Sequence, residues 1–139
     1  MINEEEKLKV IEAFYKKYHE LKDYTKEDIN NLIYVLTKTR VICEFEPKID
    51  KDKKLKMRPI ILTNKFGHKL IGIYTSNKHR KEENIDNVST LSIEVLDMCD
   101  ESILNTDLDG FVINPFTTPV PIPLPIIKMI IKIKNKIKH

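Results

Sequence analysis

The chain has 139 residues, of which 41% are hydrophobic and 32% are charged, as in a folded domain rather than a disordered segment. Its net charge of +3 is too small to indicate a nucleic-acid-binding protein by itself. No apolar run is long enough for a transmembrane helix, and the acidic start, residues 1–6, is unlike a secretory signal peptide. The two cysteines, Cys43 and Cys99, therefore favour a reducing, cytoplasmic compartment, in which we do not expect a disulfide between them.

Apolar residues recur at helical spacing in two segments near the N-terminus. Residues 4–22 predict a first helix, with acids in its first turn that suit the helix dipole. Thr25 is then an N-cap and Asp28 completes a capping box for a second helix, residues 25–38. Because the link between them is short, we expect residues 1–38 to form a helical hairpin.

The pattern next changes to the alternation of strands. Residues 41–46 predict a half-buried strand, which we expect Pro47 to end. Residues 48–56 are charged and basic without interleaved aromatic residues, so we interpret them as an exposed loop rather than a base-stacking surface. Residues 59–75 predict a hairpin that turns at Gly67.

Hydroxyl residues mark the starts of two further helices. Thr75 or Ser76 would cap a short helix over 77–83. After a brief strand at 88–90, Ser92 would cap a helix that ends at about Leu104.

The remaining segments combine acids, a short strand and prolines. Residues 94–109 contain six acids and no base, which indicates a solvated helix face and loop. A strand over Phe111–Ile113 follows Gly110 and is stopped by the Asn-Pro pair at 114–115. Alternate prolines over 115–125 then predict an extended, polyproline-like path.

The last helix is expected over residues 124–138 and is amphipathic. Its basic face carries Lys128, Lys132, Lys134, Lys136 and Lys138. Such a helix can cover a sheet, dock a partner, or lie on an anionic membrane or nucleic acid. We favour the first role, because a small sheet needs a helical cover.

The order of these elements resembles the N-terminal domain of the SseB family of bacterial proteins. The resemblance rests on a strand that ends in Tyr-Thr-Ser at 74–76 before a short helix, and on a later strand that ends in Asn-Pro at 114–115 before a terminal helix. It covers roughly residues 41–131. The chain departs from the family by its added N-terminal helical segment and by ending before the second domain of longer members. The family implies no enzymatic activity and supplies no catalytic residues.

The residues themselves give no catalytic motif. The four histidines and two cysteines are scattered, and none of their spacings is typical of zinc sites. No nucleophile elbow surrounds Ser76. We therefore expect no metal and no cofactor, and an enzyme of unrecognised chemistry ranks last among the hypotheses.

The sequence thus predicts an α+β fold, with a small, mainly antiparallel sheet covered by helices. A helical hairpin (1–38) precedes an SseB-like α+β domain (39–139) that ends in a basic amphipathic helix. We expect a non-enzymatic protein–protein interaction module whose partner is another protein, with a homodimer through an exposed sheet edge as a variant. A peripheral binder of membrane or nucleic acid through the basic helix is the alternative. The candidate binding residues are Tyr74, Thr75, Ser76, Phe111, Asn114, Pro115 and Phe116.

Overall fold

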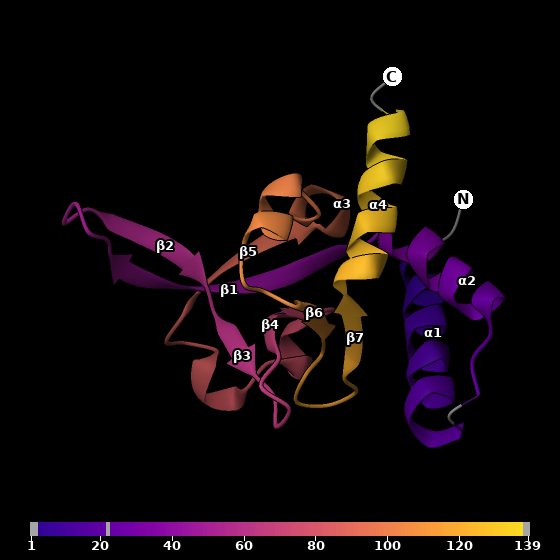
Figure 1. The fold of residues 1–139 in the computed structure, drawn as a ribbon. Helices are drawn as coiled ribbons and strands as arrows, with labels where there is room; N and C mark the ends of the chain where they lie inside the picture. Colours follow the sequence, from indigo (N-terminus) through magenta and orange to yellow (C-terminus); the bar gives the residue numbers. More distant parts are fainter. Residues whose placement is uncertain (1–2, 22, 138–139) are drawn as a thin grey trace.

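The N-terminal part of the chain is a helical hairpin, as the sequence predicts. The structure is a computed structural model that describes residues 3–21 and 23–137 (Figure 1). Helix α1 (Glu4–Tyr15) continues into a π-helical stretch (Lys16–Leu21), and α2 (Lys26–Leu36) runs back beside it.

The start of α2 forms the expected capping box. The Thr25 hydroxyl accepts from the Asp28 backbone N–H at 3.2 Å, and the Asp28 carboxylate accepts from the Thr25 backbone N–H at 2.8 Å. Asp28 also accepts from the Lys17 ammonium at 2.8 Å, which joins the two helices. This pairing and the hydrogen bonds lower the pKa of the Asp28 carboxyl.

A mixed, mainly antiparallel sheet follows, so the α+β fold class is confirmed. In chain order its strands are β1 (Arg40–Ile49), β2 (Leu55–Pro59), β3 (Ile61–Thr63), β4 (Lys69–Tyr74), β5 (Ser89–Glu94), β6 (Gly110–Ile113) and β7 (Val120–Pro123). The main path is β2-β1-β4-β6-β7, with β3 paired to β4 and β5 paired to β1. Among the described strands, only β4 and β6 pair in parallel.

The predicted end of the first strand at Pro47 is wrong, because β1 continues to Ile49. Backbone groups of a strand face alternate sides, and the Glu44 carbonyl accepts from the Ile60 N–H on the side of β2. The nitrogen of Pro47 therefore faces the opposite edge, beyond Ser89, where the pairing with β5 has ended. No ladder hydrogen bond is lost there, so the proline is tolerated.

The loop expected over residues 48–56 is instead the outer half of a two-stranded ribbon. Here β1 and β2 pair from Phe45↔Pro59 to Ile49↔Leu55. The tip is organised by the Asp50 carboxylate, which accepts from the backbone N–H groups of Asp52 and Lys54. We call residues 45–59 the ribbon; it projects from the body of the protein (Figure 1).

The chain between β4 and β6 differs most from the prediction. Two 3₁₀ turns (Asn77–His79 and Glu82–Asn84) replace the short helix, and the Ser76 side chain makes no capping hydrogen bond. Ser92 lies within β5 rather than at a helix start, because β5 pairs with β1 along its whole length. The helix expected there reduces to α3 (Val95–Met98) and a 3₁₀ segment (Glu101–Asn105).

The proline-rich segment forms a strand, β7, rather than a free polyproline path. It pairs with β6 from Val120 to Pro123. The Leu124 N–H donates to the Asp109 carbonyl, so by alternation the nitrogens of Pro121 and Pro123 face away from β6. The prolines thus occupy outward positions of an edge strand, where their missing N–H groups cost nothing.

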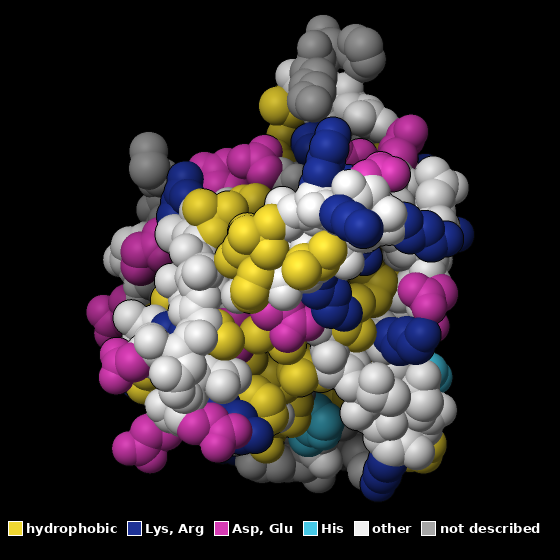
Figure 2. All heavy atoms as spheres, turned by 90° about the vertical axis from the view of Figure 1, so that its left-hand side faces the viewer, with side chains coloured by type: hydrophobic (Ala, Val, Ile, Leu, Met, Phe, Trp, Pro, Cys, Tyr) yellow, Lys and Arg dark blue, Asp and Glu magenta, His cyan; other side chains and the backbone are white. Residues whose placement is uncertain are grey.

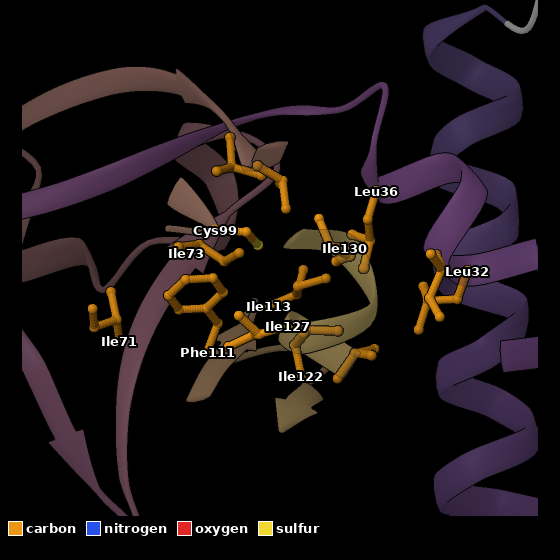
Figure 3. Packing of buried hydrophobic residues seen from close by; sticks show 14 of the residues in the cluster. Leu32, Leu36, Ile71, Ile73, Cys99, Phe111, Ile113, Ile122, Ile127 and Ile130 are labelled. Carbon is orange, nitrogen blue, oxygen red and sulfur yellow. The ribbon is translucent and has the colours of Figure 1, made fainter. Parts of the chain in front are cut away.

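One hydrophobic core joins the hairpin, the sheet and α4 (Leu124–Ile137), so the described parts of 1–38 and 39–139 pack together. Figure 3 shows the central side chains, namely Ile73, Phe111, Ile113, Ile127, Ile130, Leu32 and Leu36. Cys43 and Cys99 are free and buried in the same cluster. Burial raises the pKa of their thiols to about 11 and about 12, respectively, so both are held protonated.

Gly110, where β6 begins, should be the glycine least tolerant of substitution. Its φ is +144°, and an added Cβ would lie 2.2 Å from the Ile122 carbonyl oxygen. Gly110→Ala should therefore lower the free energy of unfolding by about 3 kcal/mol in urea denaturation. Gly67→Ala is the control, because its φ of +83° is strained but its Cβ meets nothing. It should cost about 1 kcal/mol, and equal losses would contradict the steric argument.

Candidate functional site

The predicted strand-end residues come together, because β4 and β6 are parallel and end side by side. Asn114 lies in the left-handed region with φ of +49°. Its side-chain oxygen accepts from the Thr75 backbone N–H at 3.0 Å, and its amide donates to the Thr75 hydroxyl at 3.1 Å. Its own backbone N–H donates to the Ile73 carbonyl at 2.8 Å. Asn114 therefore ties the two strand ends to each other.

Three of the seven candidate binding residues are inaccessible to a partner, and Thr75, Ser76 and Pro115 are half-buried. Tyr74, Phe111 and Asn114 are buried, whereas Phe116 is 47% exposed and stacks on Tyr74 with ring centroids 6.5 Å apart. The Lys81 ammonium lies over the Phe116 ring, 5.7 Å from its centroid. Burial and contacts thus give Tyr74, Phe111 and Asn114 a structural role, and only Phe116 offers substantial apolar surface here.

A buried ion pair lies on the sheet face opposite the main core. Glu44 and Arg80 form a 2.9 Å pair in which each side chain is 3% exposed. The guanidinium also donates to the Asn77 side chain and to the Asn84 carbonyl, both at 3.0 Å. These bonds hold the 3₁₀ turns against the sheet. Burial and the neighbouring Glu44 charge also raise the pKa of Tyr74, so its phenol stays neutral.

His79 Nδ1 lies 2.7 Å from the Thr117 hydroxyl, and desolvation with the neighbouring Lys78 lowers the His79 pKa. The Ser76 hydroxyl oxygen is buried and has no hydrogen-bond partner in the described part of the chain, so no base activates it. Within residues 3–21 and 23–137, no group of three His, Cys, Asp or Glu side chains could hold a metal ion.

The acidic segment has two structural anchors near its end. Asp107 pairs with the Lys69 ammonium at 2.7 Å, which lowers the pKa of the Asp107 carboxyl. Asp109 accepts from the Lys69 backbone N–H through its side chain and donates its own N–H to the Lys69 carbonyl, both at 2.8 Å. These contacts fasten the start of β6 to the start of β4.

The C-terminal helix packs as a cover, with Ile127, Ile130 and Ile131 in the core. Of its predicted basic residues, Lys128, Lys132 and Lys136 are exposed, Lys134 is half-buried, and Lys138 lies outside the described residues. The apolar face of α4 is therefore occupied by the protein's own core. None of the described helices has the length and apolar character to cross a membrane.

The most prominent unpartnered surface is on the ribbon, where sequence reasoning did not place it. The register pairs Ile49 with Leu55 and Pro47 with Met57, so these side chains share one face. We define the ribbon apolar face as Phe45, Pro47, Ile49, Leu55, Met57 and Pro59. Its outer members are open to solvent, with exposed fractions of 74% for Ile49, 69% for Leu55 and 48% for Met57.

The opposite face of the ribbon is charged. Glu46 pairs in register with Arg58, and Lys48 with Lys56. Figure 2, which looks at the side from which the ribbon projects, shows hydrophobic side chains gathered near its centre with charged side chains around them. The ribbon therefore has one apolar face and one charged face, which is the pattern of antiparallel strands that bury one face.

An apolar cleft of about 320 Å³ opens at the base of the ribbon apolar face. Its lining comes from the sheet, from α3 and from the 3₁₀ segment that follows: Cys43, Phe45, Pro59, Ile71, Ile93, Met98, Ser102, Ile103, Thr106 and Phe111. Since Phe45 and Pro59 belong to both features, the cleft and the ribbon apolar face form one continuous apolar strip.

The sequence does carry a signal for this surface. Apolar residues and prolines stand at alternate positions on both sides of the charged tip, in Phe-Glu-Pro-Lys-Ile (45–49) and Leu-Lys-Met-Arg-Pro (55–59). The predictions of a strand end at Pro47 and of a loop over residues 48–56 do not take this alternation of apolar residues into account.

Comparisons with protein-family models, with curated proteins and with solved structures find no match for this chain.

Asn114 should prove to be a structural residue whose backbone conformation and side-chain hydrogen bonds contribute separately to the free energy of unfolding. Asn114→Gly keeps the left-handed conformation but leaves the Thr75 N–H without its acceptor, which should cost about 1–3 kcal/mol of unfolding free energy. Asn114→Ala loses the same bonds and adds left-handed strain, for about 1 kcal/mol more. Urea denaturation of both variants measures the difference. Equal stability of the two, or no loss in either, would contradict this assignment.

Proposed function

We propose that the chain is a non-enzymatic protein–protein interaction module whose contact surface is the ribbon apolar face together with the cleft at its base. The observation that carries the proposal is the exposure of Ile49, Leu55 and Met57 on one side of a projecting ribbon. Contiguous apolar surface of this kind on a folded protein marks an interaction site.

The ribbon's own stability supports the same conclusion. A two-stranded hairpin without a covering layer is marginally stable in water. Past Phe45, β1 pairs with β2 alone, and the exposure of Ile49, Leu55 and Met57 shows that no layer covers this face of the ribbon. Burying a side chain such as Ile49 or Leu55 against a partner contributes about 1.5–3 kcal/mol. Binding would therefore both cover the face and stabilise the ribbon.

This proposal moves the interaction surface away from the strand-end cluster expected from the sequence. Phe116, with Lys81 over its ring, is the member of that cluster with the most surface open to a partner. The SseB resemblance stays a prediction, because no family match supports it. Cytoplasmic location and the absence of catalysis also stay part of the proposal.

Photocrosslinking in the producing cells would test the contact surface. A photoreactive amino acid at Leu55 should give a covalent adduct with a protein, whereas the same residue at Lys56 should give several-fold less. The two positions are adjacent on β2 and lie on opposite faces of the ribbon, so they differ in orientation but not in mobility. Equal adducts at both positions, or none at Leu55, would exclude the ribbon apolar face as the interaction surface.

A second candidate function is the binding of an anionic surface through α4. Its support is that Lys128, Lys132 and Lys136 are exposed and that no acid follows Asp109. Because the apolar side of α4 is in the core, this binding would be electrostatic rather than by insertion. The binding would depend on the lysines alone, and its affinity would fall as the salt concentration rises.

Substitution of Lys128, Lys132 and Lys136 by Gln would test this second function. Retention on anionic phospholipid vesicles at low salt should fall several-fold. Replacing Lys51, Lys53 and Lys54 at the ribbon tip by Gln is the control with the same charge change, and it should leave retention higher. Unchanged retention of the α4 variant would rule out the helix as the binding surface.

A further inference from the structure

The strip that runs from the protein body to the ribbon tip has charges of opposite sign at its two ends. Residues 48–58 contain six Lys or Arg and two Asp, a net charge of +4. Residues 94–109 contain six acids and no base, a net charge of −6. Between these ends lie the cleft and the ribbon apolar face.

The acidic end lies on the same side of the sheet as the ribbon apolar face. Met98 and Ser102, from the acidic segment, line the cleft together with Phe45 and Pro59 from the base of the ribbon. From the body outward, the surface along the strip is therefore first acidic, then apolar and finally basic.

The charges at both ends are available for pairing. Asp97, Asp100 and Glu101 are exposed and form no ion pair within the described part of the chain. The same holds at the other end for the tip lysines, which are Lys51, Lys53 and Lys54. The Asp100 carboxylate also caps the 3₁₀ segment by accepting from the Ser102 backbone N–H at 3.1 Å.

A strip with an acidic end, an apolar middle and a basic end is complementary to a second copy of itself in the antiparallel orientation. A twofold axis across the ribbon apolar face would lay two ribbons antiparallel, with apolar residues against apolar residues. Each basic tip would then lie against the acidic segment of the other copy. A parallel arrangement would instead place basic tip against basic tip, which is electrostatically unfavourable.

The lengths agree with this arrangement. From Phe45 to Lys53 at the tip the ribbon reaches on the order of 20 Å, at about 3.3 Å per residue with the turn. With a twofold axis halfway along the ribbon, about half of that reach lies beyond the axis, which brings the tip to the base of the other copy's ribbon. There Phe45 and Pro59 line the cleft together with Met98 and Ser102 of the acidic segment. Ile49, Leu55 and Met57 would lie near the twofold axis, where apolar anchors contribute most to binding.

We propose that the partner of the ribbon apolar face is a second copy of this chain, in an antiparallel twofold dimer. This inference rests on the proposed function, since it names the occupant of the same surface. In the dimer, Lys51, Lys53 and Lys54 of one copy face Asp97, Asp100 and Glu101 of the other.

Sedimentation equilibrium of the purified full chain, from about 1 to about 200 µM, tests the dimer. The wild type should reach twice its monomer mass of 16.3 kDa. Ile49→Ser with Leu55→Ser should stay monomeric, with the same urea midpoint for the body. Phe66→Ser is the control, because Phe66 is equally exposed (73%) but lies in the β3–β4 turn; it should still dimerise.

A charge-reversal mixture tests the antiparallel arrangement. One variant changes Lys51, Lys53 and Lys54 to Glu; the other changes Asp97, Asp100 and Glu101 to Lys. Each alone should dimerise at least about tenfold more weakly, because like charges then meet at both contacts. Mixed together, they should form a heterodimer with affinity restored, since opposite charges meet again at both ends.

Three results would overturn the inference: a wild type that stays monomeric throughout, a dimer unaffected by the Ile49 and Leu55 substitutions, or a mixture that does not recover. Failure here is distinguishable from failure of the proposed function. A monomer that still gives an adduct at Leu55 to a different protein refutes the self-association and leaves the interaction surface standing. A monomer with no adduct refutes both.

Discussion

The parallel pairing of β4 and β6 is the constraint on which the rest of the fold depends. It is closed at one end by the reciprocal bonds of Lys69 with Asp109 and at the other by those of Asn114 with Thr75. Parallel neighbours require a long crossover, and residues 75–109 supply it. The crossover first packs its 3₁₀ turns on one face through Arg80, then returns along β1 as β5, and finally places its acidic segment beside the cleft.

The ribbon forms because different parts of β1 pair with different strands. Its first half lies between β5 and β4, whereas its second half pairs with β2 alone. The alternation that buries Cys43 in the core continues outward through Phe45 to Ile49, but the layers that would cover it end. The apolar alternation of the core thus continues along β1 into the ribbon, where no layer covers it. This continuity explains why the exposed Ile49 lies on the same face of β1 as the buried Cys43.

Local signals in the sequence were sufficient where the determining contacts are local. The Thr25 capping box, the Phe111–Ile113 strand and the apolar face of α4 are each set by residues within a few positions of one another. The predictions for Pro47 and Ser92 are wrong because the roles of these residues depend on distant partners. Pro47 is harmless only because β5 ends before it, and Ser92 is in a strand only because β1 pairs with it. The burial of Tyr74 and Asn114, two of the predicted binding residues, is not evident from the sequence for the same reason, because it depends on the whole crossover.

The outward prolines of β7 have a consequence for how the protein can assemble. An incoming strand needs N–H donors on a sheet edge, and at Pro121 and Pro123 that edge has none. Addition of strands at β7 is therefore blocked, and the sheet cannot propagate from both of its margins. A polymer built by edge-to-edge stacking requires two competent margins, so the chain is protected from open-ended fibre growth.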